Sequence, residues 1–422
     1  MNTDNNSVYS AYIGIDWADT KHDVCIQATN DSTRTFAVIE HKVDKIDEWV
    51  QTLRKKYQGS IAIAVEISKG PIVYALQKYD CFVIFPINPA TLATYRLAFK
   101  SSRAKNDPGD AELALDMLIR YPERFQALTP QSVEMRTLTS LVEDRRNFVN
   151  DKIRLTNRLR STLKQYYPQI LEWFDHIDNP LFCNFLIRWP TLLQAKRARQ
   201  STFIQFFHKH HMFFKRVQEK RLVAIKASKP LTYDNAVIIP NRIKALALVE
   251  QLRLVLDIIE QYDNEIEQIS KQHDDFAIFD SLPGAGPILT PRLMVAFGEQ
   301  RDRFKNASDI QRYSGVAPVT EQSGKKHWVH WRWQCPTFLR QTFVEWAAKT
   351  INKSLWAGAY YYQQRARGCP HQAALRSLAF KWIRIIYRCW KTKTPYDELL
   401  YLKALKERGS KLFDKSLIAE SN

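Results

Sequence analysis

The chain has 422 residues, enough for two or three domains that each bury a hydrophobic core. Lys and Arg number 62 against 44 Asp and Glu, so the formal net charge is +18, which favours a nucleic-acid partner over a membrane surface. No apolar run reaches the roughly twenty residues of a membrane span. Residues 1–10 are polar, unlike a secretory signal, and the 6 cysteines form no Cys-x-x-Cys pair. These features exclude a disulfide framework and predict a cytoplasmic protein without a membrane partner.

Residues 8–128 are predicted to alternate strands and helices. Short apolar runs bounded by polar turns predict strands at 12–16, 24–28, 35–39, 61–67 and 81–85. Helices are predicted at 44–57, 71–78, 91–99 and 110–120. Three strands followed by alternating strand–helix units is the order of a ribonuclease-H-like (RuvC-like) domain. That fold would place the strands that carry Asp16 and Glu66 side by side, an adjacency that the periodicity alone does not reveal.

Four acidic residues occupy positions that suit a metal site. Asp16 and Glu66 follow apolar runs at strand ends, while Asp107 suits a helix N-cap and Asp110 lies one turn later. Ribonuclease-H-like nucleases hold divalent metal with this combination of acids. Hard oxygen ligands bind such ions, and two ions about 4 Å apart can hold both oxygens of a phosphoryl displacement. Each acid alone is better explained as a helix cap or an ordinary strand end, but together, in this order, they favour the site.

Residues 129–275 are predicted to form a coiled-coil region of two long helices with an insertion. The second helix carries apolar residues at alternating steps of four and three, namely Leu248, Leu252, Val255, Ile259, Tyr262, Ile266 and Ile269. The first, residues 135–166, has a strongly basic polar face that includes Arg145, Arg154 and Arg158. Such a face is commonly only solvated, but its single sign of charge also fits contact with phosphates.

Residues 168–240 interrupt the two long helices and are rich in Phe, Lys and Arg. His208, His210 and His211 suggest a metal, but no carboxylates or cysteines accompany them. A basic or packing role is therefore the preferred interpretation.

Residues 276–400 form a predicted C-terminal helical domain, and residues 401–422 a basic tail. The run Leu282-Pro283-Gly284-Ala285-Gly286-Pro287 precedes an apolar helix at 288–297. This is the helix-hairpin-helix pattern, in which backbone N–H groups hold a DNA phosphate without reading sequence. An ordinary turn between helices is the equal alternative. Gly284 and Gly286 are thus candidate contacts for nucleic acid.

A serine candidate lies in Gln322-Ser323-Gly324-Lys325-Lys326, within a predicted loop. A serine among small residues beside two lysines would suit a nucleophile that faces phosphate. From these residues alone a common polar turn is the better explanation, because the spacing places no histidine or carboxylate base beside Ser323.

Taken in order, these motifs resemble the DEDD-type insertion-sequence transposases, a family that includes the Piv and MooV DNA invertases and the bridge-RNA-guided recombinases. The resemblance rests on residues 13–18, 65–66, 105–111, 282–287, 314–318, 322–325 and 338–340. Two positions depart from the family pattern. Asn106 stands where Thr is frequent, and Cys335-Pro336 stand where Gly-Asn is frequent. The acids and the serine remain.

The resemblance implies a function for each candidate. Asp16, Glu66, Asp107 and Asp110 would bind Mg²⁺, and Ser323 would form a covalent link to DNA, with Ser314 as the alternative. Partners would be donor DNA, target DNA and a structured guide (bridge) RNA. The protein would form a dimer or tetramer, for which the coiled coil is a plausible element. Candidate contacts to nucleic acid are Lys325, Lys326, Arg340, Gly284, Gly286, Arg145, Arg154 and Arg158.

Three other functions fit part of the pattern. A Piv-like site-specific DNA invertase would share all of these residues. A plain RuvC-like nuclease or junction resolvase would need the acids without Ser323. A nucleic-acid-binding scaffold with an inactive site would need neither, and would not explain why both are present.

Overall fold

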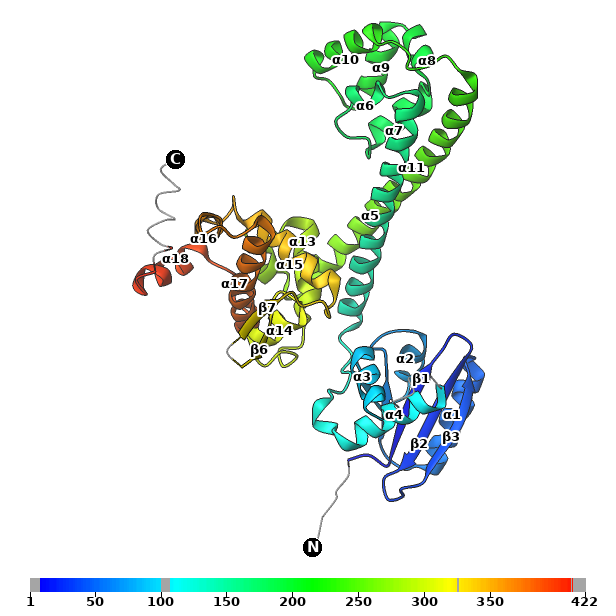
Figure 1. The fold of residues 1–422 in the computed structure, drawn as a ribbon, viewed down its shortest axis with the longest axis vertical. Coiled ribbons are helices and arrows are strands. Elements are labelled where there is room, and N and C mark those ends of the chain that lie inside the picture. The colour runs from blue at the N-terminus through cyan, green and yellow to red at the C-terminus, as the bar shows by residue number, and fades with distance from the viewer. Residues whose placement is uncertain (1–7, 100–106, 325, 411, 413–422) are drawn as a thin grey trace. The chain divides into compact units, whose positions relative to one another are not determined.

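The computed structural model of the protein describes residues 8–99, 107–324, 326–410 and 412 (Figure 1). The chain divides into two compact units, Met1–Pro130 and Gln131–Asn422. The first boundary lies close to the one expected after residue 128. A further boundary near residue 275, which the sequence suggested, stays a prediction. Each unit is described by itself below.

The first unit is built on a five-stranded sheet with the order β3-β2-β1-β4-β5. Its strands are β1 (Ala11–Trp17), β2 (Lys21–Ala28), β3 (Arg34–Glu40), β4 (Ile61–Val65) and β5 (Phe82–Pro86). β2 is antiparallel to both β1 and β3, whereas β4 is parallel to both β1 and β5. The expected adjacency of the strands near Asp16 and Glu66 is confirmed, as is a mixed α/β fold of ribonuclease-H-like order.

Helices cover both faces of this sheet. Side chains alternate between the faces of a strand, so β1 presents Ile13 and Ile15 to one side and Gly14 to the other. The first side packs on α1 (Val43–Lys56) and α2 (Pro71–Leu76). The second packs on α3 (Pro89–Phe99) and α4 (Asp107–Arg120), with Ala62 and Ala64 of β4 beneath α4. A 3-10 turn, Pro122–Arg124, follows α4.

α4 lies directly on β1 because residue 14 is glycine. A Cβ added at Gly14 would overlap the carbonyl oxygen of Ala111 and lie 2.7 Å from the backbone nitrogen of Leu115. This close approach places Ala111 and Leu115 of α4 against β1 at Gly14, two residues before Asp16.

The second unit begins with two long helices that pack along each other, α5 (Val133–Tyr166) and α11 (Asn235–Gln272) (Figure 1). They are antiparallel, since Arg145 pairs with Asp263 whereas Leu159 shares a core with Leu248. The predicted apolar seam of α11 therefore packs against α5 of the same chain. Its place in a contact between subunits stays a prediction.

The Phe-rich interruption between the long helices folds into five helices. They are α6 (Ile170–Trp173), α7 (Pro180–Arg188), α8 (Leu192–Arg197), α9 (Gln200–Lys209) and α10 (Lys215–Ala227). Phe203, Phe206 and Phe207 are buried in a shared aromatic core, as a packing role predicts, whereas Phe213 and Phe214 are exposed. The interruption ends earlier than expected, because α11 starts at Asn235 and includes Pro240.

The rest of the second unit is a helical domain with one hairpin. Its helices are α12 (Phe276–Asp280), α13 (Gly286–Phe297), α14 (Ala307–Tyr313), α15 (Thr337–Thr350), α16 (Leu355–Ala366), α17 (His371–Thr392) and α18 (Glu398–Glu407), and its hairpin strands are β6 (Val319–Ser323) and β7 (Lys326–His330). Trp346, Trp356, Trp382 and Trp390 are fully buried in its core. Leu405 and Leu412 join that core, so the predicted basic tail starts within packed structure.

Among the described residues, no helix combines the length and the apolar character that crossing a membrane requires.

Candidate active site

Asp16 and Glu66 stand next to each other at the carboxyl ends of two parallel strands. The register between β1 and β4 pairs Gly14 with Ala64 and Ile15 with Val65, and the next pair in line is Asp16 with Glu66. Both acids fall on the face covered by α4, because each lies two residues beyond Gly14 or Ala64. Both are partly buried. The sequence placed them at strand ends, and the parallel pairing brings them together.

A third acid, Asp23, lies beside Asp16 and was missed by the sequence analysis. The antiparallel register of β1 and β2 pairs Asp16 directly with Asp23, and such partners point to the same face of a sheet. Asp23 is 6% exposed, and Lys21 Nζ lies 3.8 Å from its carboxylate. The available signal was an acid directly before the apolar run that starts at Val24.

Of the two predicted ligands on α4, Asp110 is the one whose side chain the structure describes. It is 2% exposed, and its Oδ1 accepts a hydrogen bond of 2.6 Å from Arg96 Nε on α3. Its Oδ2 is buried with no hydrogen-bond partner. Asp107 is the first residue of α4, one helical turn earlier, but its side chain lies outside the description.

These acids are candidate ligands for a divalent metal ion. No group of three or more His, Cys, Asp or Glu side chains within the described ranges is arranged to hold an ion. The donors nevertheless fit a divalent cation, because carboxylate oxygens are its preferred ligands and the buried Asp110 Oδ2 lacks a partner. Arg96 supplies positive charge to Asp110 in this structure.

A second set of charges holds α4 in place. Asp116 accepts hydrogen bonds from Arg34 of β3 at 2.7 Å and from Tyr95 of α3 at 2.7 Å, and Arg34 also bonds Glu112 at 2.9 Å. Burial opposes ionisation of Asp116, but the bonds from Tyr95 and Arg34 outweigh it and lower its pKa. Burial and then the bond to Asp116 raise the pKa of Tyr95 to about 12. Asp116 therefore anchors α4 to β3 and α3, six residues beyond Asp110.

Ser323 lies in a hairpin rather than in the predicted loop. It is the last residue of β6 and pairs with Lys326, the first residue of β7, and Gly324 has a φ of 58°. Ser323, Gly324 and Lys326 are exposed, and Lys325 lies outside the described residues. The serine hydroxyl is therefore accessible at the tip of a hairpin in the second unit. It also lacks a fixed neighbouring base among its described hydrogen bonds, as the spacing suggested.

Ser314, the alternative nucleophile, is in a different setting. It follows α14, is fully buried, and donates a 3.3 Å hydrogen bond to the carbonyl of Gln311. A hydroxyl in this position is out of reach of a DNA phosphate, so the geometry favours Ser323.

The arginines predicted to contact nucleic acid differ in whether they already have a partner within the protein. Arg145 is bidentate to Asp263, and Arg154 bonds Asp151, whereas Arg158 is exposed. Arg340 donates to the carbonyl of Arg332 at 3.0 Å, and its guanidinium lies 4.5 Å from the centre of the Trp331 ring. An arginine with a carboxylate partner must exchange that partner to bind phosphate, so these positions are not equivalent.

The turn before α13 contains two glycines in left-handed backbone conformations, and its contact with phosphate stays a prediction. Gly284 and Gly286 have φ values of 73° and 57°, conformations that favour glycine. A Cβ at Gly284 would lie 3.0 Å from the carbonyl oxygen of Lys349, whereas one at Gly286 would meet no atom within 4 Å. Gly284 thus packs against α15, and Gly286 borders open space at the start of α13.

Comparison with known proteins decides the family. Residues 13–168 match a family model described as a transposase of the DEDD IS110 type, and residues 277–363 match one described as the IS116/IS110/IS902 transposase family. The chain belongs to the IS110 family of insertion-sequence transposases. The first model spans the strand-end acids and α4, and the second spans the glycine turn and Ser323. This transposase is accordingly a DNA-acting enzyme.

Relatives of this transposase are similar over most of their length. It is 29% identical over 399 residues, 92% of this chain and 96% of the relative, to the mini-circle putative transposase for IS117 of Streptomyces coelicolor. It is 24% identical to an insertion element IS116 protein of Streptomyces clavuligerus, over 90% of this chain and 95% of the relative. It is 23% identical to an insertion element IS110 protein of Streptomyces coelicolor, over 72% of this chain and 76% of the relative.

Proposed function

We propose that this transposase cuts and rejoins DNA with Mg²⁺-binding acids and a serine nucleophile, under the guidance of a bridge RNA. The observation that carries the proposal is the meeting of Asp16 and Glu66 at the ends of β1 and β4, under a helix that contributes Asp110. Buried carboxylates at one sheet edge repel one another unless a cation lies among them. An insertion-sequence enzyme must break phosphodiester bonds, and this edge suits that chemistry.

Asp16, Glu66, Asp107 and Asp110 are the residues that would hold Mg²⁺. When bound, the ion would neutralise charge on the scissile phosphate. The chain itself supplies rigidity, because two of the acids lie at the ends of paired strands and α4 is fixed by Gly14 and by the Arg34–Asp116 ion pair. A site fixed by paired strands and an anchored helix needs little rearrangement when phosphate arrives.

Ser323 is the proposed nucleophile. Its Oγ would attack phosphorus and form a phosphodiester with the serine, while the bond from phosphorus to one deoxyribose oxygen breaks. That oxygen would leave as a hydroxyl, with the proton that the serine loses. Attack by another deoxyribose hydroxyl on the serine ester would then rejoin the strands and restore Ser323. The exposed place of Ser323 at a hairpin tip supports this role.

The partners proposed are donor DNA, target DNA and a structured guide RNA. The net charge of +18 supports contact with phosphates on several strands, and Lys325, Lys326, Arg340, Arg154 and Arg158 are the proposed positions. Base pairing by the RNA would choose the sequence, while the protein contacts backbone. A dimer or tetramer is proposed, in which acids of one subunit complete a site with the serine of another.

Recombination between two plasmids tests the proposal, in cells that carry the gene with its native flanking DNA. Wild type is compared with Ser323→Ala, Asp16→Ala and, as a matched control, Ser314→Ala. We expect both Ser323→Ala and Asp16→Ala to abolish recombination. A protein–DNA adduct is expected in wild type and Ser314→Ala, and to be absent from Ser323→Ala.

Three results separate the alternatives. Strand cleavage that survives Ser323→Ala would replace the serine mechanism with a plain RuvC-like nuclease. Recombination that survives Asp16→Ala would show that the acids are not needed for the reaction. Deletion of the flanking noncoding DNA, with RNA supplied from a second plasmid, distinguishes a guided recombinase from a Piv-like invertase that acts on protein-read sites.

A further inference from the structure

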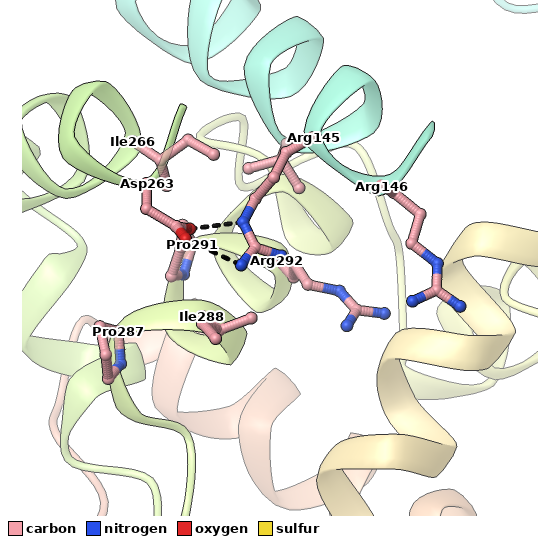
Figure 2. Close-up of a pocket in the computed structure, with 9 residues that line it drawn as sticks. Arg145, Arg146, Asp263, Ile266, Pro287, Ile288, Pro291 and Arg292 are labelled. Atoms are coloured by element: carbon pink, nitrogen blue, oxygen red, sulfur yellow. Dashed lines mark hydrogen bonds and ion pairs between the residues drawn. The ribbon is translucent and has the colours of Figure 1, made fainter. Parts of the chain in front are cut away.

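A pocket lined by three arginines lies where α5, α11 and α13 meet in the second unit. Its walls are Val142, Arg145, Arg146, Asp263, Ile266, Pro287, Ile288, Pro291 and Arg292. Figure 2 shows Arg145 and Arg146 extending from α5 on the side where Arg292 of α13 reaches in. Four of the lining residues belong to the first turns of α13, directly after the glycine turn.

Arg292 is the buried member of this pocket. It is 7% exposed, its Nε lies 3.1 Å from Thr342 Oγ1, and its Nη1 lies 2.7 Å from Glu345 Oε2. Its Nη2 is buried and has no hydrogen-bond partner. A buried guanidinium nitrogen without a hydrogen-bond acceptor is energetically costly. The Nη2 atom of Arg292 therefore indicates that a bound ligand supplies the missing acceptor.

The side chains around the pocket carry a net positive charge. Arg145 is paired with Asp263, whereas Arg146 and Arg292 share Glu345, which lies 3.8 Å from Arg146 Nη2 and 2.7 Å from Arg292 Nη1. Glu345 also accepts a 2.7 Å bond from Gln341. Burial lowers the pKa of Arg292, and its neighbours Arg146 and Arg145 lower it further against the opposing effect of Glu345. An anion would relieve this repulsion.

The start of α13 adds a second source of positive potential. α13 has 12 residues, and the first N–H groups of a helix carry a partial positive charge. Gly286 borders open space, and Ile288 in the same first turn is 46% exposed. The pocket is therefore reachable from solvent at the end of the helix where an anion is favoured.

We infer that this arginine pocket binds one backbone phosphate of DNA, with Arg146 and Arg292 as its cationic ligands. Arg146 would turn from its long contact with Glu345 to the phosphate, and the free Nη2 of Arg292 would gain an acceptor. DNA is chosen over RNA because DNA is the substrate that the family assignment establishes. The inference rests on transposase activity alone and requires neither the acid site nor Ser323.

Salt-dependent DNA binding by the full-length protein tests the pocket. A fluorescein-labelled DNA duplex of arbitrary sequence is titrated in EDTA over a series of salt concentrations, and a labelled RNA is titrated in parallel. Loss of one phosphate contact lowers the slope of log affinity against log salt by about 1. Arg146→Gln is expected to lower this slope by about 1 and to weaken DNA binding roughly tenfold.

Two further variants make the result specific. Arg253→Gln, on α11, is the matched control, since it removes the same charge from an arginine paired with Glu250. It should leave the slope unchanged. Glu345→Gln removes the competing carboxylate and should tighten DNA binding, the opposite sign to Arg146→Gln.

The proposal is overturned by any of three outcomes. Arg146→Gln and Arg253→Gln could weaken binding equally, which would indicate only long-range charge. Glu345→Gln could weaken binding, which would show that the cluster serves packing. Arg146→Gln could change RNA binding alone. Because binding is measured in EDTA and without cleavage, the result does not depend on the metal-binding acids or on the nucleophile, so failure of the catalytic proposal is distinguishable.

Discussion

Arg96 Nε lies 2.6 Å from Asp110 Oδ1, while Asp110 Oδ2 is buried without a hydrogen-bond partner. One oxygen of this carboxylate is therefore satisfied by the chain and the other is not. Asp110 is 2% exposed, and burying a charged group is costly unless a partner of opposite charge lies beside it. The Arg96 guanidinium supplies that opposite charge in this structure, and under the proposed function a divalent ion would supply more.

Arg96→Gln should destabilise the first unit in EDTA by about 3 kcal/mol, because it leaves a buried charge without its partner. Added Mg²⁺ should restore more protection to this variant than to wild type, since the ion replaces the lost cation. Hydrogen exchange of peptides from β1 and β4 measures the effect. Arg124→Gln, an exposed arginine beside Glu123, is the control. Equal responses of both variants to Mg²⁺ would disprove the link between Arg96 and the metal site.

Gly14→Ala should displace α4 and reduce strand cleavage. The added methyl group would overlap the Ala111 carbonyl, and backbone atoms cannot move aside as a flexible side chain can. Overpacking of this kind costs about 1–3 kcal/mol, and the shift would separate Asp110 from Asp16. Cleavage rate and exchange protection of α4 are the measurements. Ala37→Val on exposed β3 serves as control. A Gly14→Ala enzyme with wild-type cleavage would contradict this account of α4.

Acid should destabilise the first unit through His22. Its Nδ1 accepts from the Ala18 N–H, so its Nε2–H donates to His41 Nδ1 at 2.8 Å. Burial, and then the proximity of His41, lower the pKa of His22 to about 4 from an ordinary 6.5. The unfolded chain therefore binds the proton first, and stability present above pH 6.5 is lost as pH falls toward 4.

The free energy of unfolding should fall by about 3 kcal/mol, because the pKa of His22 lies roughly 2.5 below its ordinary value and each pKa step corresponds to about 1.36 kcal/mol. Urea unfolding of the first unit from pH 7 to pH 4 measures it. His22→Gln should flatten this pH dependence, whereas His327→Gln on the exposed strand β7 should not. A slope that persists in His22→Gln would assign it to other groups.

Ser323→Ala and Ser314→Ala should have opposite effects on activity and stability. Ser323 is exposed, so its loss should leave the melting temperature unchanged while abolishing the DNA adduct. Ser314 is buried and bonded to Gln311, so its loss should cost about 1 kcal/mol and leave the adduct intact. Thermal melting and denaturing gels report the two effects. An adduct lost only in Ser314→Ala would reverse the assignment.

Much of the first unit was predictable from the sequence because its signals are local. Apolar runs and polar turns predicted each strand and helix, and the acids at 16 and 66 follow such runs. The apolar seam of α11 was also visible. Each of these patterns needs only the neighbours of a residue along the chain, since burial of one face sets the periodicity.

Tertiary structure alone decided which elements meet. The heptad pattern marks an apolar stripe without naming the helix that covers it, and α5 of the same chain covers it. The register of β1 with β2 placed Asp23 opposite Asp16, and the contact of α3 with α4 placed Arg96 beside Asp110. The arginine pocket likewise joins residues of α5 to residues of α11 and α13 that lie more than a hundred positions later in the chain. Such pairings depend on how distant surfaces fit together, and no local pattern of residue types encodes that fit.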